Sequence, residues 1–430
     1  MPKQAQTIKK QLRTSEGMDI LKSVLGRIKP DRVEILKKVS YVVDSINDEL
    51  KQWDINAECV LGGSIAKDTF LKGDHDCDLF VKFNLDFKEE PISDVLENVL
   101  RRIFKKVERI HGSRDYFQFK YKLIQYEIVP VLALDKISQL VNTTDASPMH
   151  VAWIKQFKKG DQIRLAKAFC KGIGVYGAES YVKGFSGHVL DILTVHYGSF
   201  LKLLKAASEW EDKVVVDHYN IYKGKALNKL NVSKIDSPLI IIDPIQKERN
   251  AAAALGNEKF RLFKTNAKQF LAKPNIKYFK KPTFSINKIK KQVGSDNKLT
   301  IIEATPLKGK KDVVGAKLLK VYEHLSKYMK INEFDVIDSG WNWDAKNDVA
   351  TYYVINPSKI LSKTSIRTGP PTNSGSHAEK FKKMHTRIEI NDGRLYATVD
   401  REFRKPEKLV AHMIKQNYIK EKVKRIKIVK

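Results

Sequence analysis

The sequence predicts a multidomain α+β protein, with a small mixed sheet followed by a helical region and then by further mixed modules. Three observations predict this class. The chain has 430 residues with 42% hydrophobic content, which is enough for about three separate cores. Residues 1–145 alternate helical stripes with apolar strands, whereas residues 146–215 have helical periodicity alone. The remaining residues return to short strands and turns around single helices.

Residues 1–145 are predicted to form the order helix, strand, helix, strand. Apolar residues recur at helical spacing over residues 35–50 and again over residues 95–107. An extended apolar segment follows each helix, at residues 76–81 and at residues 120–131. This order is consistent with a small mixed sheet that helices cover on one side.

A helical region follows this first domain. Ser147 and Pro148 can begin a helix, and Ser186 can cap a later apolar run. Gly172 and Gly174 interrupt the helical pattern between these two points. We therefore expect several short helices in this region.

The rest of the chain predicts strands with turns between them. Residues 239–243 are a candidate for a buried strand, and residues 299–355 alternate strand, helix and strands as in a separate small α+β module. Residues 387–390 alternate in polarity and lead into Asn391-Asp392-Gly393, which is a signal for a hairpin turn. The returning strand is expected from Leu395 onward. We find no internal repeats.

Asp76 and Asp78 are the most informative residues of the chain. They lie in the row LGGSIAKDTFLKGDHDCDLFVKF, and residues two apart in a strand point to the same face. Two neighbouring carboxylates repel each other unless a divalent cation neutralises them, and hard oxygen ligands suit magnesium. The Gly62-Gly63-Ser64 turn upstream supplies backbone N–H groups and a hydroxyl that can hold a polyphosphate. Each motif alone is usually an ordinary strand edge or turn, but together they predict a nucleotidyl-transfer site.

Glu127 is the candidate for a third carboxylate, which is needed if two metal ions are to be bridged. It lies at the apolar end of a predicted strand, where a buried and unpaired glutamate is costly. The alternative is a surface position on an edge strand, or a partner for a nearby lysine. Asp115 and Asp135 are weaker candidates because neither lies inside an apolar strand.

Composition indicates a polyanionic partner. The chain has 79 Lys and Arg against 50 Asp and Glu, a net charge of +29, and the charge is spread over its whole length. Such an imbalance favours nucleic acid and gives binding energy that weakens as salt is raised. A lysine-rich genome would give the same composition, so charge alone does not decide the partner.

The cysteines and the hydropathy pattern predict an intracellular, cytoplasmic protein. Cys59, Cys77 and Cys170 are odd in number and have no metal-ligand spacing, so they indicate neither a disulfide framework nor a zinc site. No apolar stretch is long enough to cross a bilayer, and residues 1–12 lack the apolar core of a secretory signal. We expect no membrane partner.

The chain resembles the archaeal-type, class I CCA-adding enzymes, the tRNA nucleotidyltransferases that build the 3′-terminal CCA without a nucleic-acid template. The resemblance rests on these segments, in order: GGSIAKDTFLKGDHDCDLFV, YEIVPVL, SPMHVAW, RLAKAFCKGIGVYGAESYVKGFSGHVLDILTVHYGSF, IDPIQKERNAAAAL, RTGPP and HAEKFKKMH. It is strongest from about residue 60 to about residue 260, with patches to about residue 385. A match over that span is not expected by chance.

The resemblance implies a nucleotidyltransferase head with a polymerase β-like mixed sheet. A helical neck, a mixed α/β body and a small α+β tail then follow. The implied boundaries are 1–145 for the head, 146–215 for the neck, 216–280 with 375–430 for the body, and 281–374 for the tail.

The resemblance also implies the site residues. Asp76, Asp78 and Glu127 are the implied catalytic residues and metal ligands. The implied nucleotide-binding residues are Gly63, Ser64, Lys67, Ser147, His150, Lys167, Tyr176 and Arg249. Arg249 matches the arginine that in the family helps to read the incoming base. Family members often have Arg where this chain has Lys67, Glu where it has Asp76, and Asp where it has Glu127. The charge is kept at all three positions, but a lysine cannot bind a phosphate in the bidentate way that a guanidinium can.

The implied activity is template-independent addition of CCA to tRNA from CTP and ATP. The 3′-hydroxyl would attack the nucleotide α-phosphate with the help of two Mg²⁺ ions, with Mn²⁺ as an alternative, and pyrophosphate would leave. The implied partners are the tRNA 3′ end and acceptor stem, with a homodimer as a further candidate. Two other functions stay open: a related template-independent polymerase, such as an oligoadenylate synthase or poly(A) polymerase, and an RNA-binding protein with an inactive transferase domain.

Overall fold

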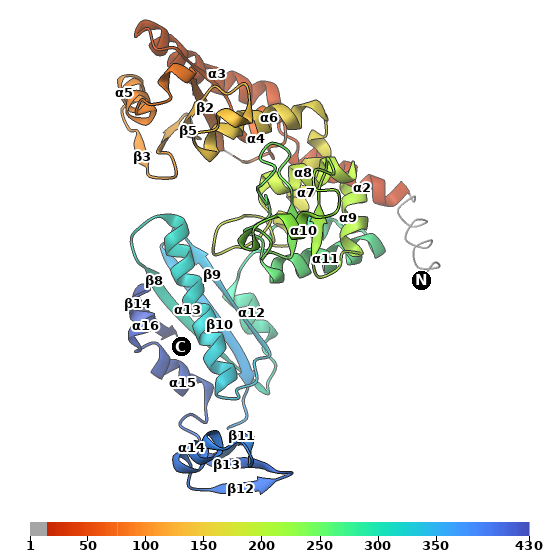
Figure 1. Cartoon of the computed structure of the whole chain (residues 1–430), viewed down its shortest axis with the longest axis vertical. Helices are drawn as coiled ribbons and strands as arrows, with labels where there is room; N and C mark the ends of the chain where they lie inside the picture. Colours follow the sequence, from red (N-terminus) through yellow and green to blue (C-terminus); the bar gives the residue numbers. More distant parts are fainter. Residues whose placement is uncertain (1–14, 75, 430) are drawn as a thin grey trace. The chain divides into compact units, whose positions relative to one another are not determined.

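A computed structural model describes residues 15–74 and 76–429. It divides the chain into two compact units, which meet in the sequence after Pro282 (Figure 1). The segment over residues 1–12, in which no secretory signal was found, lies outside the described residues. The division into head, neck, body and tail remains a prediction.

The first unit contains the mixed sheet that the sequence predicts. Strands β2 and β5 are parallel, and each of the other neighbouring pairs is antiparallel. The five strands, in spatial order, are β1 (Ala57–Leu61), β2 (Asp76–Phe83), β5 (Ile124–Leu132), β4 (Tyr116–Tyr121) and β3 (Glu108–Ile110). The prediction of two acidic strands in one mixed sheet is confirmed, and the two are neighbours.

Helices α3 (Arg32–Gln52) and α5 (Ile92–Ile103) cover one face of this sheet. Asp31 caps α3 by accepting hydrogen bonds from the backbone N–H groups of Val33 and Glu34. The apolar stripe of α3 is buried at Val39, Val42, Ile46 and Leu50. Both helices thus lie where the apolar periodicity predicts them.

The opposite face of the sheet is only partly covered. Helices α4 (Gly63–Ala66) and α6 (Ser147–Gln156) pack on it through a small cluster of Ala66, Phe80, Val131 and Val151. Asp76, Asp78 and Phe80 alternate along β2 and so share this face. The apolar part of the face therefore ends where the carboxylates begin.

A helical core completes the first unit, and its predicted signals are confirmed. Ser186 accepts a hydrogen bond of 3.1 Å from the backbone N–H of Val189, and one helix ends at Gly172 as expected. Strands β6 (Val214–Val216) and β7 (Leu239–Ile241) form a short parallel pair. The helices are α2 (Ser15–Ile28), α7 (Gly160–Gly172), α8 (Gly187–Tyr197), α9 (Phe200–Ser208), α10 (Ala226–Lys229) and α11 (Asn257–Ala272).

The second unit contains two sheets. Its antiparallel four-stranded sheet has the order β14 (Val423–Val429), β8 (Asn297–Pro306), β10 (Val349–Pro357) and β9 (Asp338–Asp344). Its three-stranded sheet has the order β11 (Thr364–Pro371), β13 (Arg394–Asp400) and β12 (Ile388–Asn391). The predicted hairpin joins β12 to β13, with positive φ at Asp392 and Gly393.

One helix of the second unit, α14 (Ser376–Met384), packs on β11 of the three-stranded sheet, and the longer helices pack on the four-stranded sheet. Helix α13 (Lys311–Ile331) confirms the helix that the sequence predicts between two strands, and it shares a core with α15 (Pro406–Met413). The shorter helices are α12 (Ile286–Gln292), α14 and α16 (Asn417–Lys420).

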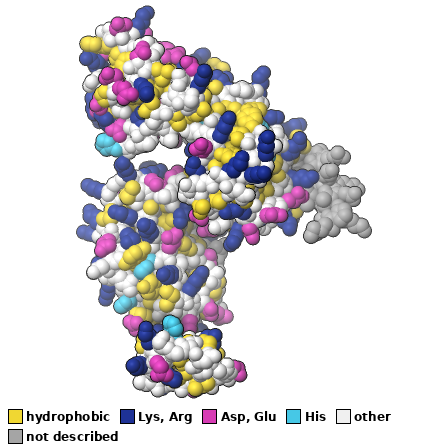
Figure 2. Space-filling view, in the orientation of Figure 1, with side chains coloured by type: hydrophobic (Ala, Val, Ile, Leu, Met, Phe, Trp, Pro, Cys, Tyr) yellow, Lys and Arg dark blue, Asp and Glu magenta, His cyan; other side chains and the backbone are white. Residues whose placement is uncertain are grey.

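Lysine and arginine side chains are spread along both units in the visible face of Figure 2, so the positive charge is not confined to one segment. Among the described helices, none is both long enough and apolar enough to span a bilayer. Cys59, Cys77 and Cys170 are buried as free thiols.

Candidate active site

The three predicted carboxylates lie on two neighbouring strands. Asp78 of β2 is the register partner of Glu127 of β5, and Asp76 is opposite Gln125. Because the strands are parallel and in register, the side chains of these positions share one face. Asp78 and Glu127 are partly buried, whereas Asp76 is exposed. The structure therefore brings the acid cluster, defined here as Asp76, Asp78 and Glu127, to one face of the sheet near the start of β2.

The acid cluster carries more negative charge than the described groups around it neutralise. Burial raises the pKa of Asp78, and the neighbouring Asp76 raises it further, against the opposing effect of Lys67 and Lys167. Burial also raises the pKa of Glu127, although a hydrogen bond of 3.0 Å from Gln118 favours its charged form. Both carboxylates are thus in an environment that a cation would stabilise.

Asp115, the competing carboxylate, is in the opposite situation. Its oxygen accepts a hydrogen bond of 2.7 Å from the guanidinium of Arg109, and this bond lowers its pKa. An ion pair at the surface of the sheet accounts for Asp115 without a ligand. Glu127 therefore remains the predicted third member of the cluster.

Gly63 brings the turn into contact with the acid cluster. Its φ is +51°, a value that L-residues with a side chain rarely adopt, and a Cβ atom there would lie 1.6 Å from Oδ2 of Asp78. The backbone N–H of Gly62 donates to the carbonyl oxygen of Asp78 over 2.8 Å. Ser64 follows within the single turn of α4, so its position is fixed relative to the carboxylates.

Lys67 and Lys167 share a buried carboxylate that the sequence did not single out. The Nζ atom of Lys67 lies 2.9 Å from Oδ2 of Asp191, and that of Lys167 lies 4.0 Å from Oδ1. Lys167 also donates to the hydroxyl of Thr69 over 2.8 Å. Burial would raise the pKa of Asp191, but the two ammonium groups outweigh it and lower that pKa. Burial lowers the pKa of Lys167 to about 8, against the opposing charge of Asp191.

Tyr176 lies beside Lys167, at the start of α8. A Cβ atom at Gly187 would lie 3.2 Å from the hydroxyl of Tyr176 and 3.6 Å from Cε of Lys167, so the two side chains meet beside the start of α8. Burial raises the pKa of Tyr176, with Asp191 as a further cause. Ser147 is the first residue of α6 and is partly buried.

His150 and Arg249 meet on a second carboxylate, Asp243, which follows β7 and is completely buried. Nε2 of His150 lies 2.8 Å from Oδ1 of Asp243. Nε2 of His188 lies 3.1 Å from Oδ2, and Nη1 of Arg249 lies 3.0 Å from the same oxygen. The backbone N–H groups of Ile245 and Gln246 also donate to Oδ1 over 3.0 Å each. We call Asp243 with His150, His188 and Arg249 the Asp243 cluster.

Several hydrogen-bond donors surround the carboxylate of Asp243. Burial alone would raise its pKa, but the hydrogen bonds from His150 and His188 outweigh burial and lower the pKa well below its usual range. Burial lowers the pKa of His188, against the opposing effect of its hydrogen bond with Asp243. A metal ion would have to share this carboxylate with the Arg249 guanidinium, and the cluster is therefore better described as a hydrogen-bonded scaffold.

Three of these residues were not identified from the sequence: Asp191, His188 and Asp243. Asp191 is an acid within the apolar run of α8, and Asp243 is an acid at the end of a buried strand; both patterns could have signalled a buried charge. His188 and Asp191 lie three positions apart on α8. This helix therefore links the lysine pair to the Asp243 cluster.

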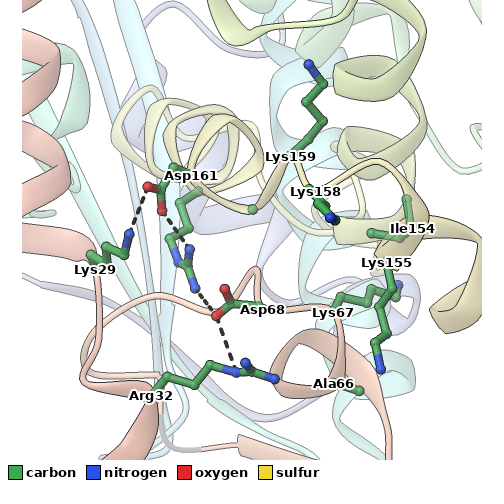
Figure 3. Close-up of a pocket in the computed structure, with 12 residues that line it drawn as sticks. Lys29, Arg32, Ala66, Lys67, Asp68, Ile154, Lys155, Lys158, Lys159 and Asp161 are labelled. Atoms are coloured by element: carbon green, nitrogen blue, oxygen red, sulfur yellow. Dashed lines mark hydrogen bonds and ion pairs between the residues drawn. The ribbon is translucent and has the colours of Figure 1, made fainter.

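A cavity of about 340 Å³ lies beside Lys67, lined by the end of α4 and by the turn between α6 and α7 (Figure 3). Its two acids are already paired. Asp161 contacts Lys29 over 2.9 Å and Arg164 over 2.7 Å, and Asp68 contacts Arg164 as well as Arg32. Arg164 is itself buried and donates to the carbonyl oxygen of Phe70.

Three further lysines line this cavity: Lys155, Lys158 and Lys159. Figure 3 draws no interaction to any of them, and within the described parts of the chain their side chains make no ion pair or hydrogen bond. The cavity therefore offers uncompensated positive charge.

Family models match three successive parts of the chain. A nucleotidyltransferase domain matches residues 43–141, the second domain of tRNA nucleotidyltransferase matches residues 161–280, and the C-terminal domain of CCA-adding enzyme matches residues 299–426. A protein named CCA-adding enzyme from Nanoarchaeum equitans is 36% identical over 383 residues, which cover 87% of this chain and 91% of that protein. Another, from Methanocaldococcus jannaschii, is 30% identical over 402 residues, covering 90% and 88%.

Solved structures share the fold at low identity. A structure of Cid1, titled for its RNA terminal uridylyl transferase activity, matches with a TM-score of 0.51 and 13% identity over 63% of this chain and 100% of that chain. A structure of the Cid1 poly(U) polymerase bound to MgATP matches with a TM-score of 0.50 and 13% identity, over 62% and 99%. Together with the nucleotidyltransferase model over residues 43–141, these structures show a nucleotidyltransferase fold, as the sequence predicts.

Proposed function

The chain belongs to the family of CCA-adding enzymes, and from the geometry of its site we propose how it adds CCA to the 3′ end of tRNA without a template. The observation that carries the proposal is the acid cluster beside Gly63. Burial and the neighbouring carboxylates raise the pKa values of Asp78 and Glu127, so a bound cation would stabilise their charged forms. Hard oxygen ligands on one face suit divalent cations such as Mg²⁺, with Mn²⁺ as an alternative.

We assign Asp76, Asp78 and Glu127 as the residues that would hold these cations. Bound divalent cations would lower the pKa of the tRNA 3′-hydroxyl and stabilise the charge of the departing pyrophosphate. Asp78 is the central ligand because it lies between Asp76 along its own strand and Glu127 on the neighbouring strand. We propose two ions, as the number that three bridging carboxylates can share.

The lysine pair is assigned to the triphosphate, together with Gly63 and Ser64 of the turn. Lys67 and Lys167 lie close enough to influence the charge of Asp78, so phosphates held by these lysines would lie next to the cations. Asp191 holds both ammonium groups in place before the nucleotide arrives. Tyr176 supplies a hydroxyl group beside Lys167, and we keep Ser147, at the start of α6, as a predicted nucleotide contact.

The Asp243 cluster is assigned to the base of the incoming nucleotide. Arg249 is about half exposed although its guanidinium is anchored to a buried carboxylate, so it can present donors to a ligand from a fixed position. His150 is held by the same carboxylate and is nearly buried. With CTP and ATP as substrates, these side chains would select the incoming base, which a template strand selects in other polymerases.

We assign the unpaired lysines of the cavity to the RNA. Lys155, Lys158 and Lys159 have no acidic partner among the described residues, and RNA phosphates are the polyanion that the enzyme must hold. The acceptor stem is the proposed partner, because it follows directly from the 3′ end at which the reaction takes place. We place the reaction in the cytoplasm, with either a monomer or a homodimer as the active form, which light scattering distinguishes.

The function is tested with tRNA that ends at the discriminator base. The purified protein is incubated with this tRNA and CTP, ATP, or both, and the products are resolved at single-nucleotide length. We expect two additions with CTP alone and three with both nucleotides. Addition of repeated AMP residues with ATP alone would instead favour a poly(A)-type polymerase, and no addition would favour an inactive transferase domain.

A further inference from the structure

The segment of residues 67–74 connects two parts of the proposed site. It begins with Lys67, which follows α4, and it leads to Asp76, the first residue of β2. Its residues form neither helix nor strand. Backbone without regular hydrogen bonding keeps one conformation only if other contacts offset the loss of conformational entropy. The separation between Lys67 and the acid cluster therefore depends on what holds this segment.

Side chains from one face of α7 hold the segment. Arg164, Lys167 and Lys171 are three and four positions apart, so they lie on the same side of this helix. Lys167 donates to the hydroxyl of Thr69 over 2.8 Å, and Lys171 donates to a carboxylate oxygen of Asp74 over 2.8 Å. The helix thus contacts the segment at several points along its length.

Arg164 contacts the segment through two of its three nitrogen atoms. Nε donates to the carbonyl oxygen of Phe70 over 3.0 Å, and Nη2 donates to Oδ1 of Asp68 over 2.5 Å. Nη1 donates to Asp161, in the first turn of α7, over 2.7 Å (Figure 3). A guanidinium is planar and its donors point in fixed directions. These contacts therefore define the orientation of the segment as well as its distance from α7.

The burial of Arg164 distinguishes it from a surface ion pair. Only 2% of this residue is exposed, although the neighbouring residues 165–166 and 168–169 of the helix already supply apolar packing. Desolvation of a guanidinium is costly, and a buried ion pair often stabilises a protein no better than apolar side chains of similar volume do. A gain in stability therefore does not explain a buried arginine at this position. Its contacts instead specify one arrangement of the segment.

Arg164 also lies between two hydrophobic cores. Phe70 packs in the core of the mixed sheet, and Cζ of Arg164 lies 5.8 Å from the centroid of the Phe70 ring. The apolar residues of α7 pack in the helical core. A Cβ atom at Gly160 would lie 2.4 Å from the carbonyl oxygen of Asp68, so α7 and the segment also approach closely at the backbone. Arg164 thus links the helical core to the backbone that precedes the acid cluster.

We propose that Arg164 is a positioning residue for nucleotidyl transfer, which fixes the segment of residues 67–74 and thereby the separation between Lys67 and the acid cluster. This inference rests on the proposed function, in which Lys67 binds the triphosphate and the acid cluster binds the cations. The α-phosphate must be placed correctly relative to both. A displacement of about 1 Å at a reacting centre can lower the rate about 100-fold.

The test measures single-turnover addition of CMP by the full-length enzyme, in excess over tRNA that ends at the discriminator base. We expect Arg164→Met, which keeps a long side chain but removes the donors, to lower the rate at saturating CTP about 10- to 100-fold. A misfolded fraction of the enzyme would lower the amplitude and not this rate. The Kd of CTP, taken from the concentration dependence of the rate, should change less than about threefold, because Lys67 and Lys167 keep their contacts with Asp191.

A second variant tests the same contact from its partner. Asp68→Ala removes one acceptor from Arg164 and leaves the bond to the carbonyl oxygen of Phe70, so we expect a smaller loss in rate of at most about 10-fold. The double variant should be no slower than Arg164→Met alone, because the two side chains act through one hydrogen bond. Mg²⁺ should raise the melting temperature of each variant as much as that of the wild type, since the acid cluster stays on the sheet.

Arg109→Met is the matched control. Arg109 also holds several groups, with ion pairs of 2.7 Å to Asp94, Glu97 and Asp115, but all of these lie outside residues 67–74. This variant should lose stability in urea and keep the wild-type rate.

A wild-type rate in Arg164→Met, or a loss confined to the Kd of CTP, would overturn the proposal. If Arg164→Met did not fold, a wild-type rate in Asp68→Ala would overturn it instead. If the wild type added neither CMP nor AMP, the proposed function itself would have failed.

Discussion

The acid cluster and the Asp243 cluster are two carboxylate sites of the first unit with opposite charge balance. In the acid cluster, Asp78 and Glu127 lie side by side and their pKa values are raised. In the Asp243 cluster, a single carboxylate accepts from two histidines, an arginine and two backbone N–H groups, and its pKa is lowered.

This difference distinguishes carboxylates that bind a ligand from carboxylates that hold other side chains in position. A site that is short of positive charge is completed by something outside the chain, whereas a carboxylate with all its donors in place holds other side chains still. Both sites are built around carboxylates, yet the functions that we propose for them differ. The first would contact the reacting groups, and the second would position the side chains that do.

Removal of Asp78 should have the largest effect on activity. Asp78→Ala should abolish incorporation of CMP and AMP, with a loss in kcat of at least about 10³-fold, because the central cation ligand is gone. Binding of tRNA, measured by filter retention, should stay nearly unchanged. Asp115→Ala is the control on the same sheet, and its ion pair with Arg109 predicts a small loss of stability and normal addition. Retained addition by Asp78→Ala would refute the assignment.

Removal of Asp243 should have the largest effect on stability. Asp243→Ala leaves several buried donors without an acceptor, and we expect a loss of about 3–5 kcal/mol in the free energy of unfolding. The pKa of Asp243 is lowered by folding, so its contribution is fully present above the unfolded pKa and is lost as pH falls through the folded one. In urea unfolding, the difference between wild type and variant should thus shrink only below about pH 4. A difference that shrinks at neutral pH would contradict this.

Asp78→Asn should stabilise the protein in the absence of metal, whereas Asp243→Ala should destabilise it. Folding raises the pKa of Asp78, so its charge destabilises the metal-free protein once pH rises above the unfolded value of about 4. In EDTA at pH 7, the variant should melt at a higher temperature than the wild type. Mg²⁺ at 100 times its Kd should stabilise the wild type by about 2.7 kcal/mol, and the variant much less. Equal responses to Mg²⁺ would place the cations elsewhere.

Replacement of the cavity lysines should have the smallest effect. Combined Lys155, Lys158 and Lys159 substitutions to Gln should reduce the slope of log K against log salt for tRNA binding by up to about 2.7, or about 0.9 for each phosphate contact. The kcat with saturating tRNA should be unchanged. Gln at Lys202 and Lys205, which lie on α9 away from this cavity, is the matched control. An unchanged slope would show that the cavity does not contact RNA.

The parts of the site that the sequence predicts depend on short spacings. Asp76 and Asp78 follow from the two-residue period of a strand, and the hairpin at Asp392 and Gly393 follows from local turn chemistry. The missing parts depend on contacts between distant positions. His150 and Asp243 are 93 positions apart, and His188 and Asp243 are 55 positions apart. No local pattern specifies such pairs, because the fold of the helical core brings them together.

Helix α8 carries both His188 and Asp191, which serve different parts of the proposed nucleotide site. Three residues of an α-helix span about 4.5 Å along its axis, and the buried Val189 and Leu190 between them hold this segment in the core. The spacing between the Asp243 cluster, which we assign to the base, and the lysine pair, which we assign to the phosphates, is thereby set by one rigid helical segment. A nucleotide would have to place its base and its phosphates at this spacing to contact both groups.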